Sequence, residues 1–148
     1  MGPLNFPQYR FNIKDDKGGK KIFDRLRKKF VALQPEELVR QNMVEWLINE
    51  KGYPENKMAN EVVVTINGMQ KRCDGLVYSK DFEPLMIIEY KSPVVSITQE
   101  VFDQILTYNT KLEVDYILVS NGLQHICCRI ADGKVHFLKE IPMYKDLL

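Results

Sequence analysis

One apolar run constrains the fold more than any other feature of the sequence. Leu85-Met86-Ile87-Ile88 is followed directly by Glu89, Tyr90 and Lys91. Its length suits a strand, and an unbroken apolar run is typical of a strand that is buried on both faces of a sheet. We therefore expect a central strand over residues 84–90.

The expected elements around this strand follow a fixed order. Pro35 begins a helix that ends before Gly52 and Pro54, because proline suits the first helical turn and glycine and proline end helices. Strands are expected over 61–66, 70–78 and 84–90, then a helix over 98–112, then strands over 116–120, 124–130 and 135–138. The helix between the strands at 84–90 and 116–120 suits a parallel pair, and the Asn67-Gly68 and Asp132-Gly133 turns suit antiparallel pairs. This order predicts an α/β domain with a mixed central β-sheet flanked by helices, in the order α-β-β-β-α-β, with N- and C-terminal β-hairpins.

The size and composition suit one globular unit. The chain has 148 residues, of which 45% are hydrophobic. We expect a loose arm over residues 1–9 and a hairpin over 10–23 within an N-terminal segment 1–30, followed by a single globular domain over 31–148. Three cysteines without a C-x-x-C pair, and the absence of a long apolar stretch, indicate a cytoplasmic protein with no membrane partner.

Basic residues are concentrated near the N-terminus, although the formal net charge is only +1. Between Lys17 and Lys29, Asp24 is the only acid. The basic residues of this run are Lys17, Lys20, Lys21, Arg25, Arg27, Lys28 and Lys29. Such a run either lies along nucleic-acid phosphates or forms a solvated helix face.

The tripeptide Glu89-Tyr90-Lys91 places two polar residues at the end of the apolar strand. Residues two apart on a strand point to the same face, so Glu89 and Lys91 project together from a rigid position. A second E-x-K tripeptide, Glu55-Asn56-Lys57, follows Pro54 in an expected loop, where we expect solvated surface. The context of the strand, rather than the tripeptide itself, makes Glu89 and Lys91 candidates for chemistry.

Asp74 supplies a second acid if the turn between the neighbouring strands covers residues 80–83. Val77 then pairs with Met86, and Asp74 lies opposite Glu89 with the Cβ atoms roughly 4.5 to 5.5 Å apart. Two carboxylates so close repel each other unless one is protonated or a cation lies between them. Oxygen ligands favour Mg²⁺, which also accepts phosphate oxygens, and Lys91 would orient or deprotonate an attacking water or stabilise charge on the phosphate.

Alternatives exist for each of these residues. Glu89 and Lys91 would cap an edge strand if Asp74 pairs with Arg72 or Lys71 instead. A zinc site would use His125, Cys127 and Cys128, with His136 as a distant fourth ligand. However, Cys128 faces the opposite side of a strand from His125 and Cys127, and the cysteines suit small strand hydrophobes better.

The ordered set of motifs resembles the PD-(D/E)XK nuclease superfamily and, within it, the N-terminal nuclease domain of type I restriction enzyme R subunits and its small stand-alone relatives. The motifs that carry the resemblance, over about residues 20–130, are Ile22-Phe23-Asp24, Arg27-Lys28-Lys29, the stretch from Pro35 to Gln41, Glu61, Arg72-Cys73-Asp74, the stretch from Glu89 to Pro93, and the stretch from Gln104 to Tyr108. The resemblance implies a restriction-endonuclease-like core and metal-dependent hydrolysis of DNA.

The resemblance also implies roles for single residues. Asp74 and Glu89 would hold Mg²⁺, or Mn²⁺ in its place, and Lys91 would serve catalysis. An acid of the first helix would join the metal: Glu37 is our choice and Glu36 the alternative, although either would also complement the helix dipole. Three further residues, Gln104, Tyr108 and Arg40, would contact DNA or support the active site, although Tyr108 also suits the core and Gln104 the surface.

The sequence departs from the family pattern in two respects. Cys73 stands where proline precedes the aspartate in the superfamily, which is a mild change because this position mainly shapes the strand. The chain also lacks the G-x-x-x-x-G-K-[ST] loop of a helicase-like motor, so we expect a stand-alone domain whose partners are DNA and other restriction-system subunits or a helicase. The alternative is a non-catalytic nucleic-acid or protein-binding module that retains the nuclease fold.

Overall fold

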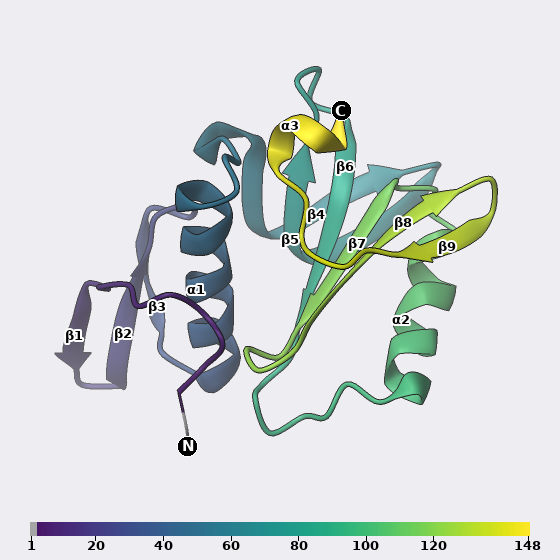
Figure 1. Ribbon diagram of the computed structural model, residues 1–148. Helices are drawn as coiled ribbons and strands as arrows, with labels where there is room; N and C mark the ends of the chain where they lie inside the picture. The colour runs from purple at the N-terminus through teal and green to yellow at the C-terminus, as the bar shows by residue number, and fades with distance from the viewer. Residues whose placement is uncertain (1–2) are drawn as a thin grey trace.

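The protein is arranged in layers around one mixed sheet (Figure 1). A computed structural model describes residues 3–148, except for the side chains of Tyr108 and Thr110. A small three-stranded sheet covers the outer side of helix α1 (Pro35–Asn49), and α1 separates it from the large sheet. Helix α2 (Gln99–Thr110) lies on the opposite face of the large sheet. The predicted α/β class, with a mixed sheet between helices, is confirmed.

The large sheet has six strands in sequence order. They are β4 (Met58–Ile66), β5 (Met69–Tyr78), β6 (Pro84–Tyr90), β7 (Tyr116–Ser120), β8 (His125–Ala131) and β9 (Lys134–Phe137). Strands β6 and β7 are parallel, and every other neighbouring pair is antiparallel. The parallel pair forms because α2 returns the chain to the same edge of the sheet, as the sequence predicts.

The apolar run of residues 85–88 lies in a buried strand, as expected. Leu85, Met86, Ile87 and Ile88 are all buried in β6. Met86 and Ile88 belong to the core cluster beneath α1, whereas Ile87 packs with Leu76 and Leu112 on the other face. Strand β6 is therefore covered on both sides and is an interior strand, which excludes the expected alternative of an edge strand.

The register between β5 and β6 largely follows the prediction. Val77 pairs with Met86 and Gly75 with Ile88, as expected. The turn is different, because Tyr78 pairs with Pro84 across a register shift and not with Leu85. At Gly75 a Cβ atom would lie 3.1 Å from Ile88 Cβ and 3.2 Å from the Tyr90 ring, so the absent side chain allows close packing.

The helices begin as their sequences indicate. Helix α1 has Pro35 in its first turn with Glu36 and Glu37 after it, and the polar residues Glu37, Arg40, Gln41 and Asn42 are buried in it. In α2, the side chain of Thr98 accepts a hydrogen bond from the backbone N–H of Val101 and caps the N-terminus. A short C-terminal helix, α3 (Tyr144–Leu147), was not predicted. Within residues 3–148, no helix combines the length and the apolar character needed to cross a membrane.

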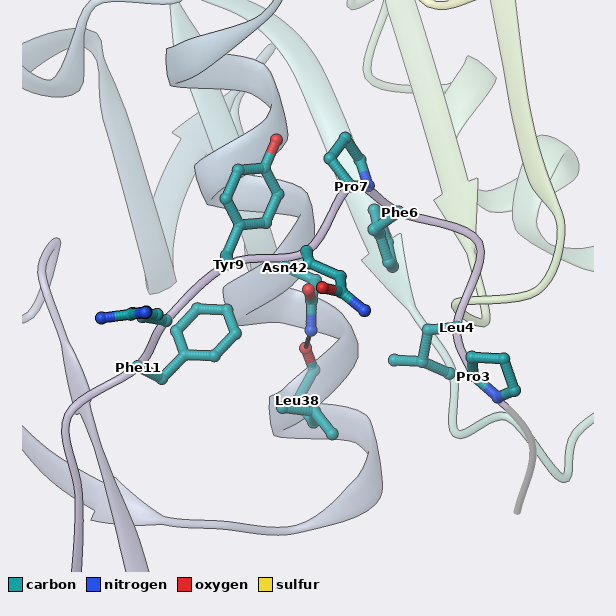
Figure 2. A pocket seen from close by; sticks show the side chains of 10 residues that line it. Pro3, Leu4, Phe6, Pro7, Tyr9, Phe11, Leu38 and Asn42 are labelled. Carbon is teal, nitrogen blue, oxygen red and sulfur yellow. Dashed lines mark hydrogen bonds between the residues drawn. The ribbon is translucent and has the colours of Figure 1, made fainter.

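The N-terminal segment differs from the prediction in two ways. The expected hairpin, β1 (Ile13–Asp16) and β2 (Gly19–Asp24), continues into a third strand, β3 (Lys29–Ala32). The basic run therefore forms a strand, a turn and a strand, and not a helix face. The arm before it is also not loose: Asn5 donates its N–H to the Gly122 carbonyl (2.7 Å), and the arm runs along Leu38 and Asn42 of α1 (Figure 2).

Candidate active site

Asp74 and Glu89 meet where β5 and β6 run side by side. The pairing of Gly75 with Ile88 brings the next residues along, Asp74 and Glu89, opposite each other. Their carboxyl groups are close enough for a side-chain hydrogen bond between them to raise the pKa of Glu89. Asp74 Oδ2 also accepts a hydrogen bond from the backbone N–H of Tyr90 (2.9 Å), which fixes the carboxylate against β6. The structure thus brings together the two acids that the register argument paired.

The pair binds one proton more tightly than isolated carboxyl groups would. The pKa of Glu89 is raised to about 7, first by burial and then by the negative charge of Asp74 and the hydrogen bond to Asp74. The positive charges of Lys71 and Lys91 act in the opposite direction. Two close carboxylates in a half-buried site therefore share a proton near neutral pH, and a cation between them would replace that proton.

Lys91 follows β6 and is held by its backbone. Its N–H donates to the carbonyl of Ser120 at the end of β7 (2.9 Å), so the parallel pairing extends to this residue. The side chain is half-buried, and its charge lowers the pKa of both Glu89 and Glu36. Among the residues that the structure describes, its ammonium group forms no ion pair within 4.0 Å. Of the expected alternative, in which Asp74 pairs with Arg72 or Lys71, the structure excludes the Arg72 pairing, because Arg72 pairs with Glu61.

Glu37, our choice as a third metal ligand, is occupied by other partners. Its carboxylate is buried and accepts hydrogen bonds from Arg27 (2.7 Å), Arg40 (2.7 Å) and Gln41 (2.9 Å). These three donors use both of its oxygens, so the carboxylate joins α1 to the N-terminal sheet. A metal ion at Glu37 would have to displace two guanidinium groups.

Glu36, the alternative acid, interacts electrostatically with one member of the acid pair. It is half-buried, and its pKa is raised, first by burial and then by the negative charge of Asp74. The charges of Arg40 and Lys91 oppose this shift. Glu36 therefore lies within electrostatic reach of both Asp74 and Lys91.

Arg40 lies behind the site rather than at its surface. Its side chain is only 4% exposed, and it donates to Glu37 (2.7 Å), to Glu61 (2.5 Å) and to the backbone carbonyl of Asp74 (3.3 Å). Its guanidinium also lies over the ring of Tyr90, 5.3 Å from the centroid. Of the two roles expected for Arg40, the burial favours support of the site over contact with DNA.

Glu61 and Arg72 complete this arrangement; sequence reasoning assigned Glu61 no role and considered Arg72 only as a partner of Asp74. Glu61 accepts from the buried Arg40 and from Arg72 (2.9 Å), whose side chain is 75% exposed. Glu61 also has a φ of 51° in the middle of β4, opposite Asp74, a conformation that costs energy for a residue with a side chain. Arg40 could have indicated in the sequence that such residues exist, because an arginine on the apolar face of a helix needs carboxylate partners.

Gln104 and Tyr108 were expected to contact DNA or support the site. Gln104 is exposed on α2 and lies in a shallow groove formed by neighbouring residues of the helix and Lys111. Neither Asp74 nor Glu89 lines this groove. The side chain of Tyr108 lies outside the described residues.

The zinc alternative finds no support. His125 Nδ1 is 2.8 Å from Ser120 Oγ, and its Nε2 is 2.7 Å from the Asn5 carbonyl oxygen, so both ring nitrogens have partners. Cys127 and Cys128 are buried in clusters on opposite faces of the sheet, as the strand alternation predicts. The second E-x-K tripeptide is surface, as expected: Glu55 is exposed and pairs with Arg25.

The acid pair offers a cation two oxygen-bearing side chains. Over the described part of the chain, no three His, Cys, Asp or Glu side chains converge closely enough to form a complete metal site by themselves. Mg²⁺ suits such a partial site, because it usually keeps several waters and is bound by one or two carboxylates together with substrate phosphates. The donor set therefore fits Mg²⁺ or Mn²⁺ and does not fit a structural zinc ion.

Comparison with known proteins identifies relatives of the chain. A family model described as the type I restriction enzyme R protein N terminus matches residues 35–142. The fold is similar to a solved fragment assigned to an HsdR subunit of a type I restriction enzyme from Vibrio vulnificus YJ016, with a TM-score of 0.58 and 22% identity over 79% of this chain. The chain spans 25% of the length of that structure, and at this identity the likeness shows the fold alone. A search of curated proteins found no match.

Proposed function

Because the chain belongs to the family of type I restriction enzyme R protein N termini, we propose that it is a metal-dependent nuclease domain that hydrolyses phosphodiester bonds of DNA at a PD-(D/E)XK-type site. The observation that carries the proposal is the position of Asp74 opposite Glu89 at the junction of β5 and β6, beside Lys91. Burial first, and the negative charge of Asp74 second, raise the pKa of Glu89 to about 7 at this position. Such a pair of acids is stable at neutral pH with a shared proton or with a divalent cation.

Each residue has a definite task in this proposal. Asp74 and Glu89 would hold Mg²⁺ or Mn²⁺, and Glu36, which interacts electrostatically with Asp74, would replace Glu37 as the acid of the first helix at this site. A bound divalent ion would polarise the scissile phosphate and lower the pKa of a water molecule. Lys91 orients that water or stabilises the negative charge that develops on the phosphate.

The relatives suggest the partners. The similar fragment from Vibrio vulnificus is assigned to a subunit of a type I restriction enzyme. We therefore propose DNA as the substrate and other restriction-system subunits, or a helicase, as protein partners.

A nuclease assay with matched variants tests the proposal. Purified protein is incubated with plasmid and linear DNA in Mg²⁺ or Mn²⁺, beside Lys91→Ala and Lys57→Ala. The second variant is a matched control, because Lys57 belongs to the surface E-x-K tripeptide. We expect cleavage by the wild type and by Lys57→Ala, and at least about a hundredfold loss in Lys91→Ala. Equal cleavage by all three proteins would defeat the assignment of Lys91.

The alternative is a binding module that kept the fold without the activity. The observation that favours it is the absence, among the described residues, of a third side chain close enough to complete a metal site. Calorimetric titration with Mn²⁺ separates the two functions. Metal binding that is abolished by Asp74→Asn supports the enzyme, whereas no heat of binding in the wild type supports the module.

A further inference from the structure

The N-terminal sheet (β1–β3) carries the chain's excess of positive charge. Nine basic and three acidic residues lie between Arg10 and Ala32, whereas the rest of the chain has twelve basic and seventeen acidic residues. The sheet lies on the far side of α1 from the large sheet (Figure 1). A basic region on an otherwise acidic protein attracts polyanions to that region in particular.

The arginines and the lysines of this region behave differently. Arg25 pairs with Glu45 and Glu55 (2.8 Å each), and Arg27 pairs with Asp24 and with Glu37, so both guanidinium groups hold the sheet against the rest of the domain. In the part of the chain that the structure describes, five lysines of this region form no ion pair, and Lys20 pairs only with a highly exposed aspartate. These five are Lys14, Lys17, Lys21, Lys28 and Lys29. Their charge is therefore available to an external anion.

Aromatic side chains share the outer face of this sheet with lysines. Ile22 and Asp24 are fully buried, so Phe23 between them points to the opposite face, where it is 37% exposed. Phe23 pairs across the strands with Phe30, and the two rings contact edge to face at 5.3 Å. Lys14, on the same face, holds its ammonium 4.2 Å from the centroid of the Phe30 ring. Aromatic faces next to ammonium groups suit bases and phosphates that alternate along a strand.

A hollow of about 450 Å³ lies beside Phe23. Phe11 of the N-terminal arm, which runs along α1 in Figure 2, forms part of its lining. The polar lining consists of Arg10, Asn12 and Gln41, together with Arg25 and the two glutamates, Glu45 and Glu55, that Arg25 neutralises. Two aromatic rings with nearby hydrogen-bonding groups match the two needs of a nucleobase, a stacking surface and polar partners for its edge.

We propose that the outer face of the N-terminal sheet binds single-stranded DNA, with phosphates on the lysines and a base stacked on Phe23. The strand must be single, because the bases of a duplex stack on each other and are not free to stack on a phenyl ring. Arg27 and Glu37 join this sheet to α1, so the bound strand keeps a fixed orientation relative to the candidate active site. The binding requires no metal ion and adds a surface that the proposed nuclease site does not include.

Fluorescence anisotropy in EDTA tests the electrostatic part. The probes are a fluorescein-labelled oligothymidylate and a duplex of the same length. Lys14→Gln/Lys21→Gln removes two charges, and Lys134→Gln/Lys139→Gln is the matched control on exposed lysines elsewhere. At 0.1 M salt we expect about fivefold weaker binding per lysine and a salt slope that is shallower by about 1.4, with no change in the control. Equal losses in both double variants would overturn the proposal.

A second pair of variants tests the stacking part. Phe23→Leu keeps an apolar side chain without a ring, and Phe82→Leu is the control, because Phe82 is 57% exposed and also has a lysine, Lys57, over its ring. We expect at least about fivefold weaker binding of the oligothymidylate to Phe23→Leu, little change with the duplex, and none in the control. An unchanged affinity in Phe23→Leu overturns the proposal, as does a wild type that fails to bind the oligothymidylate.

Melting temperatures confirm that each variant is folded. The outcome is also distinct from that of the nuclease assay. Binding of the oligothymidylate in EDTA without cleavage of DNA in Mg²⁺ would contradict the proposed nuclease function and support the binding surface. Cleavage of DNA in Mg²⁺ with no loss of oligothymidylate affinity in the lysine variant would support the nuclease function and contradict the binding surface.

Discussion

Substitution of Arg40 by methionine should destabilise the protein strongly while leaving its surface unchanged. The guanidinium is 4% exposed and donates to Glu37, Glu61 and the Asp74 carbonyl, and methionine fills similar space without any of these bonds. Removal of one partner from a buried ion pair costs about 3–5 kcal/mol, because the remaining charge stays buried without compensation. Here Glu37 keeps Arg27 and Gln41, and Glu61 keeps Arg72, so we expect the lower end, about 3 kcal/mol.

Urea unfolding followed by circular dichroism measures this loss. The matched control is Arg72→Met, which removes the exposed partner of the same glutamate; at 75% exposure it should cost at most about 1 kcal/mol. Arg40→Lys should fall between the two, because it keeps the charge but not the fork of donors. A free energy of unfolding that falls by less than about 1 kcal/mol in Arg40→Met, or by the same amount in both methionine variants, would show that the buried ion pairs of Arg40 do not stabilise the fold.

Two further predictions follow from the acid pair and from the glycine beside it. In metal-free protein the pKa of Glu89, about 7, lies above its ordinary value of 4.5, so the folded state holds a proton that the unfolded state releases, and the free energy of unfolding falls as pH rises between these values. Melting temperatures from pH 5 to 8 should show this fall in the wild type relative to Glu89→Gln, and Mg²⁺ should reverse it at pH 7.5; parallel curves for the two proteins would contradict the assignment. Gly75→Ala should cost about 1–3 kcal/mol because the new methyl group meets Ile88 and Tyr90, whereas Gly18→Ala, with no atom within 4 Å, should change stability by less than about 0.5 kcal/mol; equal chemical-denaturation midpoints for the two variants would argue against close packing at Gly75.

The sequence predicts the large sheet well because its signals are local. The apolar run in β6, the Asn67-Gly68 turn and the Pro35 helix start each depend on residues within a few positions, and the structure confirms them. The pairing of Val77 with Met86 followed from the turn length. The pairing predicted for Tyr78 was wrong because the register shifts beside the turn, and no local sequence pattern reveals this shift.

The partners of buried charges could not be predicted, because they come from distant parts of the chain. Glu36 and Glu37 are adjacent and both suit a first helical turn, so only the arrival of Arg27 from the N-terminal sheet distinguishes them. The positive φ of Glu61 likewise has no signal in its β-branched surroundings. The arm was expected to be loose because its prolines suggest irregular chain, yet Asn5 is held by Gly122 and His125.

The ion pairs of the N-terminal sheet have a practical consequence for the choice of expression fragment. The span that matches the family model begins at residue 35, after the last strand of that sheet. A protein trimmed to this span would lack the ion pairs of Arg27 with Glu37 and of Arg25 with Glu45, and the hydrogen bond between Asn60 and Asp24. The carboxylates of α1 would then be exposed to water without their guanidinium partners. Fragments for biochemistry should therefore begin upstream of the first strand, although the span matched by the family model begins later.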